Sequence, residues 1–189
     1  MKTTILAFVT ALVTAAALAA QSTTLQQWEA ARKLKPARVS SIERIAPATE
    51  PGIPFIVHGT VVDPGGKPAA GVEVLAYHTD NTGSYAAQGA ADPWRLKGWA
   101  VTDAQGRFEF RTIRPAPYPG GQIAAHVHFL MATSCCGRQV AEVMFDDDPI
   151  ATPAYRERAR DVLFGKVTRG AGGAQEVAYT LKLKTTGDF

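Results

Sequence analysis

The strongest constraint on the fold is a succession of short apolar runs separated by turn sequences. The runs are rich in β-branched and aromatic residues, and glycine, proline or aspartate stands between them, which is typical of a β-sandwich. About seven such runs occur, near residues 55–62, 72–78, 99–102, 107–111, 123–130, 139–145 and 175–184. The sequence therefore predicts an all-β fold, an antiparallel β-sandwich of about seven to eight strands.

Two helices and one hairpin are expected beside these strands. A capping-box spacing predicts a short N-terminal helix over about residues 25–34. A threonine cap followed by proline predicts one helical excursion near the C-terminus, from Thr152 to about Leu163. Turn residues at 103–106 predict that the strands on either side pair as a hairpin.

The first twenty residues have the features of a secretory signal peptide. Lys2 gives the positive start, residues 5–16 are apolar, and Ala17-Leu18-Ala19 is a small-residue cleavage site, so cleavage is expected near residue 20. The alternative, a retained membrane anchor, is disfavoured because the apolar segment is short for a bilayer. The expected parts are a signal peptide at 1–20, an N-terminal lead-in at 21–53 and a sandwich domain at 54–189. The mature protein is expected to be exported, periplasmic or secreted, without a membrane segment.

Composition limits the partners of this chain. Its formal net charge is +3, from 20 basic and 17 acidic residues of scattered position, which is too mild for nucleic acid binding. A homo-oligomer is left open, with the N-terminal helix as its candidate contact. The two cysteines, Cys135 and Cys136, are adjacent. The sequence does not decide whether they form a vicinal disulfide, stay reduced or bind a ligand.

A pair of histidines inside one apolar run is the first candidate for chemistry. His126 and His128 stand two residues apart, and side chains alternate along a strand, so both point to the same face. Imidazole pairs are common ligands of transition metals. The alternative is two satisfied histidines on a core strand.

Two tyrosines in predicted loops extend this candidate site. Tyr85 leaves a turn rich in glycine and polar residues, and Tyr118 lies between Pro117 and Pro119, which stiffen the backbone. A phenol titrates near about 10, but a bound cation can displace its proton. Because phenolate is a hard anionic donor, two phenols and two imidazoles predict ferric iron. The alternative for each tyrosine alone is surface or edge packing.

Several short motifs occur in order along the middle of the chain. They are Thr102-Asp103, Gly106-Arg107-Phe108, Thr112-Ile113-Arg114-Pro115, Pro117-Tyr118-Pro119 and His126-Val127-His128-Phe129. Together they resemble the linked signatures of intradiol ring-cleavage dioxygenases, and the resemblance covers roughly residues 55–145. A β-sandwich without a site has no reason to combine them in this order.

The resemblance implies a metal site and a reaction. By matching motif position, Tyr85, Tyr118, His126 and His128 would bind one non-haem Fe(III) ion. Tyr118 would also be catalytic, leaving the metal to help take protons from a catechol-type substrate. The family reaction uses O2 to cleave the ring between its two hydroxyl-bearing carbons and yields a muconate-type diacid.

The chain departs from the family pattern near this site. Ile123 stands where family members usually carry an arginine that helps to stabilise the anionic substrate, and Arg114 and Arg138 are the candidate replacements. Glu142 is the nearest match to a site-facing glutamine, and its charge would repel an anionic ring substituent. An export signal is also unusual beside the cytosolic enzymes of the family.

Two other classes of protein remain as alternatives to the dioxygenase. One is a catalytically silent sandwich module of the transthyretin-like or carboxypeptidase-associated type. The other is an exported metal- or phenol-binding protein without turnover, which would explain the missing arginine. Other conspicuous residues are not expected to belong to a site. His58 and His78 are expected to be surface or sheet histidines, and the acidic run at 146–148 a solvated turn and not a calcium site. Trp28, Trp94 and Trp99 are expected to pack in a core or a subunit interface.

Overall fold

The computed structural model describes residues 26–85, 92 and 94–185. The predicted signal peptide and the expected first residue of the N-terminal helix lie outside this part of the chain, whereas residues 26–32 are helical as predicted. The chain divides into two units, residues 1–34 with Phe189 and residues 35–188, and the second unit contains the sandwich. None of the helices in the described ranges has the length and apolarity needed to cross a bilayer.

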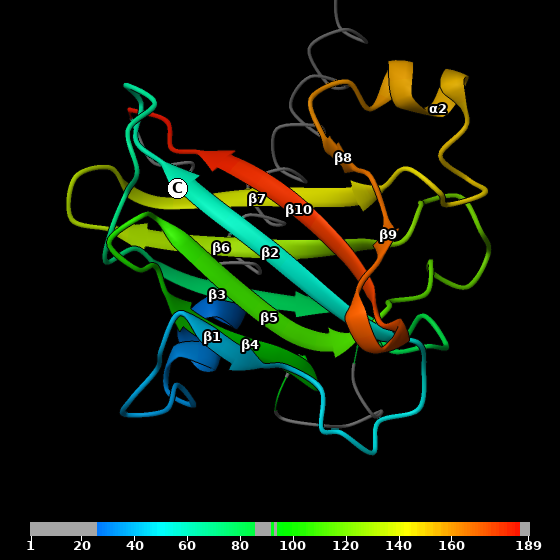
Figure 1. Ribbon diagram of the computed structural model, residues 1–189, viewed down its shortest axis with the longest axis horizontal. Coiled ribbons are helices and arrows are strands. Elements are labelled where there is room, and N and C mark those ends of the chain that lie inside the picture. Colours follow the sequence, from blue (N-terminus) through cyan, green and yellow to red (C-terminus); the bar gives the residue numbers. More distant parts are fainter. Residues whose placement is uncertain (1–25, 86–91, 93, 186–189) are drawn as a thin grey trace, which may run out of the picture. The chain divides into compact units, whose positions relative to one another are not determined.

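Two five-stranded sheets form the second unit (Figure 1). Sheet A has the order β1-β5-β2-β10-β9 and sheet B the order β4-β3-β6-β7-β8. Their strands are β1 (Ile42–Arg44), β2 (Pro54–Val62), β3 (Glu73–His78), β4 (Leu96–Val101), β5 (Arg107–Ile113), β6 (His126–Thr133), β7 (Gly137–Phe145), β8 (Leu163–Gly165), β9 (Thr168–Arg169) and β10 (Gln175–Lys182). The all-β sandwich prediction is therefore confirmed.

The predicted runs correspond to the longer strands of the two sheets. The strands β1, β8 and β9 lie at sheet edges and bring the number of strands within the described residues to ten, above the seven to eight expected. Pairing is antiparallel at β2–β5, β3–β4, β3–β6, β6–β7 and β9–β10, and parallel at β1–β5, β2–β10 and β7–β8. Strand β1 extends sheet A with residues that the sequence placed in the lead-in.

The core lies between the two sheets because apolar side chains alternate along the strands. Along β2 the buried positions are Phe55, Val57, Gly59 and Val61, with less buried residues between them. Phe55, Val57 and Val61 join one cluster that includes Phe110 of sheet A and residues of sheet B. Burying a large apolar side chain contributes about 1.5–3 kcal/mol, so this cluster is the main stabilising feature of the sandwich.

The predicted hairpin at residues 103–106 is wrong, although the turn itself forms. Asp103 N–H donates to the Arg107 carbonyl at 3.0 Å, and Gly106 N–H donates to the Asp103 carbonyl at 2.9 Å. The flanking strands then separate, because β4 pairs with β3 in sheet B and β5 pairs with β2 in sheet A. The turn therefore carries the chain from one sheet to the other.

The predicted C-terminal helix is shorter than expected. Thr152 is its cap and Pro153 lies in its first turn as predicted, but α2 spans only Pro153–Arg158. Leu163 belongs instead to β8, which pairs with β7. After Ala159 the chain turns and becomes extended, and Phe164 of β8 packs against the same small apolar cluster as Tyr155 of the helix.

The adjacent cysteines, whose state the sequence left open, lie in the turn between β6 and β7. Cys135 and Cys136 are joined to each other as a vicinal disulfide. Because they are neighbours in the chain, this bond constrains the turn and not the fold.

Candidate metal centre

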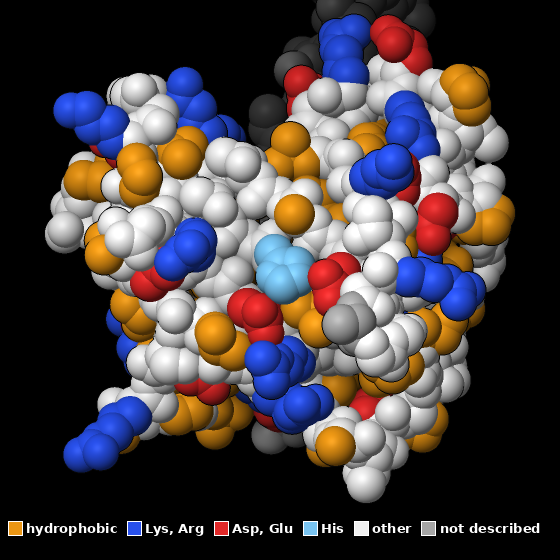
Figure 2. All heavy atoms as spheres, in the orientation of Figure 1, with side chains coloured by type: hydrophobic (Ala, Val, Ile, Leu, Met, Phe, Trp, Pro, Cys, Tyr) orange, Lys and Arg blue, Asp and Glu red, His pale blue; other side chains and the backbone are white. Residues whose placement is uncertain are grey.

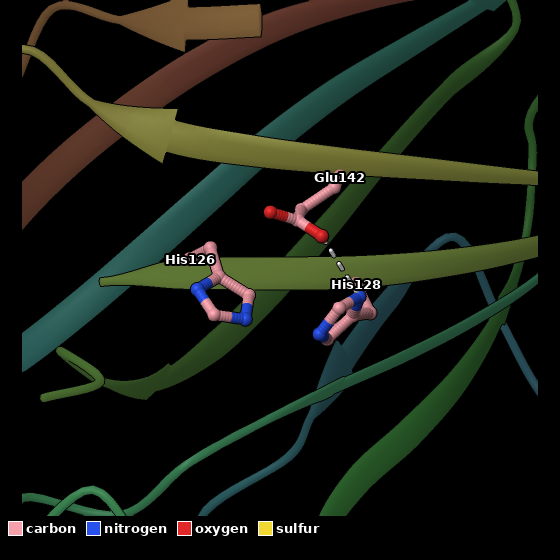
Figure 3. Close-up of side chains that lie close together, drawn as sticks. All are labelled: His126, His128 and Glu142. Atoms are coloured by element: carbon pink, nitrogen blue, oxygen red, sulfur yellow. Dashed lines mark ion pairs between the residues drawn. The ribbon is translucent and has the colours of Figure 1, made fainter. Parts of the chain in front are cut away.

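The two histidines of β6 lie on the outer face of sheet B. Val127, between them, is buried in the core, so the alternation of the strand directs His126 and His128 to the opposite face. His128 stands in register with Tyr77 of β3 on one side and with Glu142 of β7 on the other. Figure 3 shows the two imidazoles and Glu142 lying close together.

Two phenols from separate loops meet these imidazoles. The Tyr118 hydroxyl lies 3.0 Å from His126 Nε2, and the Tyr85 hydroxyl lies 2.9 Å from His128 Nε2. The Tyr85 hydroxyl is also 3.4 Å from His126 Nε2 and contacts the Tyr118 hydroxyl. The structure thus brings all four predicted side chains together at one point.

The orientation of His126 is fixed by backbone groups. Its Nδ1 lies 2.7 Å from the Ala124 carbonyl, which can only accept, so Nδ1 carries the proton and Nε2 presents a lone pair to the phenols. The preceding residue is held by Asp148, whose carboxylate accepts the Ala125 N–H at 2.9 Å. His126 therefore enters the site with its ring already oriented.

The orientation of His128 depends on side chains. Glu142 Oε2 lies 3.6 Å from His128 Nδ1, and the two form an ion pair when the ring is charged. The ring stacks on Tyr77 with centroids 4.7 Å apart, and Tyr77 stacks in turn on Trp94 at 3.7 Å. These stacking contacts restrict rotation of the imidazole, so its Nε2 points toward Tyr85.

A tight turn positions Tyr85. The Asp80 carboxylate accepts the backbone N–H groups of Thr82 at 2.8 Å and Ser84 at 3.1 Å. Partial burial opposes ionisation of Asp80, but the hydrogen bond from the Thr82 hydroxyl and those from the two N–H groups lower its pKa to about 2. Arg95 N–H donates to the Tyr85 carbonyl at 2.7 Å, which holds the residue after the turn.

The two tyrosine loops are joined to each other. Thr79 Oγ1 donates to the Ala116 carbonyl at 2.6 Å, and Ala116 N–H donates to the Asp80 carbonyl at 3.1 Å. Gly83 has a φ of +84°, and a Cβ there would lie 2.3 Å from the Pro117 carbonyl oxygen. Only glycine fits this close approach, which sets the separation of Tyr85 and Tyr118.

Burial favours the neutral form of these donors. It raises the pKa of the Tyr85 and Tyr118 hydroxyls, and the charge of Glu142 adds to the rise at both. Burial, together with the neighbouring His126, lowers the pKa of His128 to about 3. A cation at the point where the four groups meet would compensate the ionised phenols, so the donor set fits a hard trivalent ion such as Fe(III).

A hollow of about 280 Å³ opens beside Tyr118, lined also by Pro119, Gly120, Gln122 and Ile123. Neither Arg114 nor Arg138, the candidate replacements for the family arginine, lines this hollow. Arg114 pairs with Asp147 at 2.5 Å and with Gln175 at 2.9 Å. Arg138 stands opposite Ala132 of β6, four residues beyond His128, which is about 13 Å along the strand.

Other residues singled out in the sequence have structural roles. His78 is fully buried, with Nδ1 at 2.6 Å from the Thr79 carbonyl and Nε2 at 2.7 Å from Thr112 Oγ1. His58 lies between two carboxylates on sheet A. The acidic run at 146–148 is not simply solvated as expected, because Asp148 is 7% exposed and anchors the entry to β6.

Sequence reasoning missed the residues that support the four donors. Tyr77, Thr79, Gly83 and Asp148 lie around the site, but none belongs to a motif with a recognised chemical role. The glycine in the turn before Tyr85 was the one available signal, since glycine is frequent where two backbones approach closely.

Comparisons with known proteins show the family to which this chain belongs. A sequence model of the family described as Dioxygenase matches residues 35–185. The chain is 31% identical over 170 residues to catechol 1,2-dioxygenase 1 of Acinetobacter lwoffii, covering 80% of this chain and 53% of the relative. It is 33% identical over 129 residues to the protocatechuate 3,4-dioxygenase beta chain of Burkholderia cepacia, covering 59% of this chain and 55% of the relative. The chain thus spans about half the length of these curated relatives.

Solved structures share the fold. Catechol 1,2-dioxygenase from Acinetobacter sp. ADP1, inhibited by bound mercury, superposes with a TM-score of 0.65 at 20% identity over 80% of this chain and 59% of that chain. The dioxygenase domain of a dioxygenase carbohydrate-binding protein fusion from Streptomyces sp. SirexAA-E superposes with a TM-score of 0.61 at 24% identity, over 79% of this chain and 92% of that one. With the family match over most of its length, the chain belongs to the intradiol ring-cleavage dioxygenase family.

Proposed function

We propose that this protein is a non-haem Fe(III) intradiol dioxygenase that cleaves a catechol-type ring between its hydroxyl-bearing carbons with O2. The product would be a muconate-type diacid. The observation that carries the proposal is the convergence of two phenols and two imidazoles, which are linked by phenol–imidazole contacts of 2.9 to 3.4 Å, in a member of this family. The relatives named catechol 1,2-dioxygenase support the substrate class.

In this proposal Tyr85, Tyr118, His126 and His128 hold the iron. Ferric iron, when bound, supplies the Lewis acidity that withdraws electron density from an aromatic diol. Tyr118 is the donor that lines the hollow, so its hydroxyl oxygen is placed to take a proton from an entering diol. His126 and Tyr85 are more enclosed and keep their positions through the backbone contacts described above.

The surroundings of the site support a small substrate without an anionic ring substituent. Ile123 lines the hollow where the family pattern has an arginine, and Glu142 adds negative charge nearby. A ring carboxylate in the hollow would meet no cation in its lining, and the Glu142 carboxylate beside His128 would repel it, which disfavours its binding. Catechol itself is therefore the proposed substrate type.

Export of the mature protein after cleavage near residue 20 is part of the proposal. The signal-like sequence of residues 1–20 supports it, and the disulfide between Cys135 and Cys136 suits an oxidising compartment. Expression of the full chain, followed by fractionation and N-terminal sequencing, tests it. Mature protein in the periplasm or medium that begins near residue 21 is the expected result. Association into a homo-oligomer stays a prediction.

A visible spectrum with an oxygen-uptake assay tests the activity. Iron-loaded protein is expected to be burgundy-brown, to change spectrum on addition of catechol and to consume O2. A colourless protein that takes up no ferric ion would identify a silent sandwich module. A coloured protein without oxygen uptake would identify a binding protein without turnover.

A further inference from the structure

Glu142 is a charged residue of the candidate centre that takes no part in the proposed ring cleavage itself. Its side chain is 33% exposed, and it stands directly opposite His128 in the β6–β7 ladder. The carboxylate oxygen Oε2 is 3.6 Å from His128 Nδ1, and Figure 3 marks this contact between the two side chains. The carboxylate therefore faces the ring nitrogen that does not point to the phenols.

The two histidines of the site have the same requirement and meet it differently. Each must carry its proton on Nδ1 in order to present a lone pair on Nε2. For His126 the acceptor at Nδ1 is the neutral Ala124 carbonyl at 2.7 Å. For His128 the group near Nδ1 is the carboxylate of Glu142, while Nε2 lies 2.9 Å from the Tyr85 hydroxyl.

We propose that Glu142 is a positioning residue for the metal centre, in which its carboxylate attracts the Nδ1 proton of His128 and adds negative charge behind that ligand. The inference rests on the proposed function, because it assigns Glu142 a role in holding the same ferric ion. A carboxylate behind a metal-binding histidine fixes the ring tautomer and raises the basicity of the ligating nitrogen.

The charge of Glu142 also bears on the oxidation state that the site prefers. A trivalent ion with two phenolates and two neutral imidazoles leaves one positive charge, and the Glu142 carboxylate compensates it. Loss of that compensation disfavours Fe(III) more than Fe(II), because the ferric site carries the larger charge. Glu142 is thus expected to tighten ferric binding and to lower the midpoint potential.

Two substitutions separate the contributions of Glu142. Glu142→Gln keeps a carbonyl acceptor of similar size and removes the charge, whereas Glu142→Leu removes both. We expect ferric iron, measured by competition with a chelator, to bind about tenfold more weakly in Glu142→Gln and up to about a hundredfold more weakly in Glu142→Leu. The midpoint potential is expected to rise in both variants. Glu109→Gln, which alters the glutamate opposite His58, is the matched control and should leave both values unchanged.

A second measurement does not require iron. Nitrogen-15 NMR of the metal-free protein reports which ring nitrogen carries the proton, and His126 serves as an internal reference. We expect His128 to be protonated on Nδ1 in the unsubstituted protein and to show a mixture of tautomers in Glu142→Leu.

The outcomes separate this inference from the proposed function. Wild-type affinity and potential in Glu142→Leu, in a protein that binds ferric ion, would overturn the role of Glu142 and leave the dioxygenase proposal standing. An unsubstituted protein that binds no ferric ion would overturn the proposed function and with it this role in metal binding. His128 protonated on Nε2 in the metal-free protein would overturn the inference in either case.

Discussion

Each sheet of the sandwich carries a histidine opposite a glutamate on its outer face, yet only one of these pairs lies in a candidate metal centre. In sheet B, His128 stands opposite Glu142 with 3.6 Å between Nδ1 and Oε2. In sheet A, His58 stands opposite Glu109 with 3.5 Å between Nδ1 and Oε2. Register and separation are nearly equal, so a His–Glu pair on a strand ladder does not by itself make a site.

The difference lies in what covers each pair. The His58 side chain is 42% exposed, against 22% for His128. Figure 2 views the sheet A face, where histidine lies at the surface beside acidic side chains. A hollow of about 380 Å³ surrounds His58 and has no tyrosine in its lining, whereas the smaller hollow near His126 is lined by Tyr118. Loops that bring phenols, and not the size of a cavity, distinguish the two regions.

Removal of His126 is expected to have the largest effect on iron binding at sheet B. His126→Ala deletes one of two imidazole donors and leaves three groups, so bound iron is expected to be lost. Elemental analysis of the purified variant measures this, with His58→Ala as the control that keeps iron. Full iron occupancy in His126→Ala would contradict the assignment of the centre to sheet B.

Tyr118→Phe tests the contribution of a loop phenol. The variant keeps the ring and removes the oxygen that meets His126 at 3.0 Å and lines the hollow. We expect turnover of catechol to fall at least about a hundredfold, as is usual when a proton-transfer group is lost, and the visible band to weaken. Tyr179→Phe, whose hydroxyl donates to the Met144 carbonyl inside the fold, should keep the colour. Unchanged spectra and rates in Tyr118→Phe would remove Tyr118 from the centre.

Gly83→Ala tests whether the joined loops define the site. The added Cβ would clash with the Pro117 carbonyl oxygen, and alanine is strained at a φ of +84°. The free energy of unfolding should therefore fall by about 1–3 kcal/mol. Iron affinity should fall as Tyr85 moves from Tyr118. Gly66→Ala is the matched control, since Gly66 has φ of +86° with open space around it. Equal effects of both substitutions on iron binding would show that the loop contact is irrelevant.

His78 adds a histidine whose two nitrogens are both used inside the protein. Burial lowers its pKa from 6.5 to about 4, so the folded state resists protonation. The stabilising contribution is complete above pH 6.5 and is lost as the pH falls toward 4, amounting to about 2 kcal/mol between pH 7 and 5. Denaturant unfolding of metal-free protein should show this slope, which His78→Gln removes and His58→Gln retains. An unchanged slope in His78→Gln would disprove the linkage.

The smallest expected effect concerns the choice of substrate. Ile123→Arg places a cation beside the hollow and should raise kcat/KM for 3,4-dihydroxybenzoate relative to catechol by roughly tenfold, less at high salt. Ile42→Arg, at a comparably exposed isoleucine of sheet A, should not change the ratio. A ratio that stays constant in Ile123→Arg would show that the substrate ring does not approach this position.

Most strands could be predicted from the sequence, and so could the shared face of His126 and His128. Both depend on alternation along a single run, which is a local property. The phenols were different, because the residues around Tyr85 and Tyr118 indicated only loops. They joined the candidate site through their donor chemistry and then through the family resemblance, and the contact of Gly83 with Pro117 that joins their loops was not predicted.

The wrong predictions share a physical cause, because each of these structures depends on residues far away in the chain. The turn at Asp103 forms the same hydrogen bonds whether or not its strands continue as a pair, so local residues do not reveal the change of sheet. Asp148 resembles a solvated acid until the Ala125 amide, 23 residues earlier, meets it. Leu163 fits the helical pattern of the local sequence, but pairing with β7 places it in a strand.

The parallel pairing of β2 with β10 has a consequence for the order of assembly. Strand β2 pairs with a strand about 120 residues later in the chain, as the register of Phe55 with Gln175 shows. Contacts of such long separation slow folding, so sheet A stays incomplete until the segment that forms β10 has been synthesised. For export as proposed, late completion of sheet A would be favourable, because a translocation channel accepts a chain that has not yet folded.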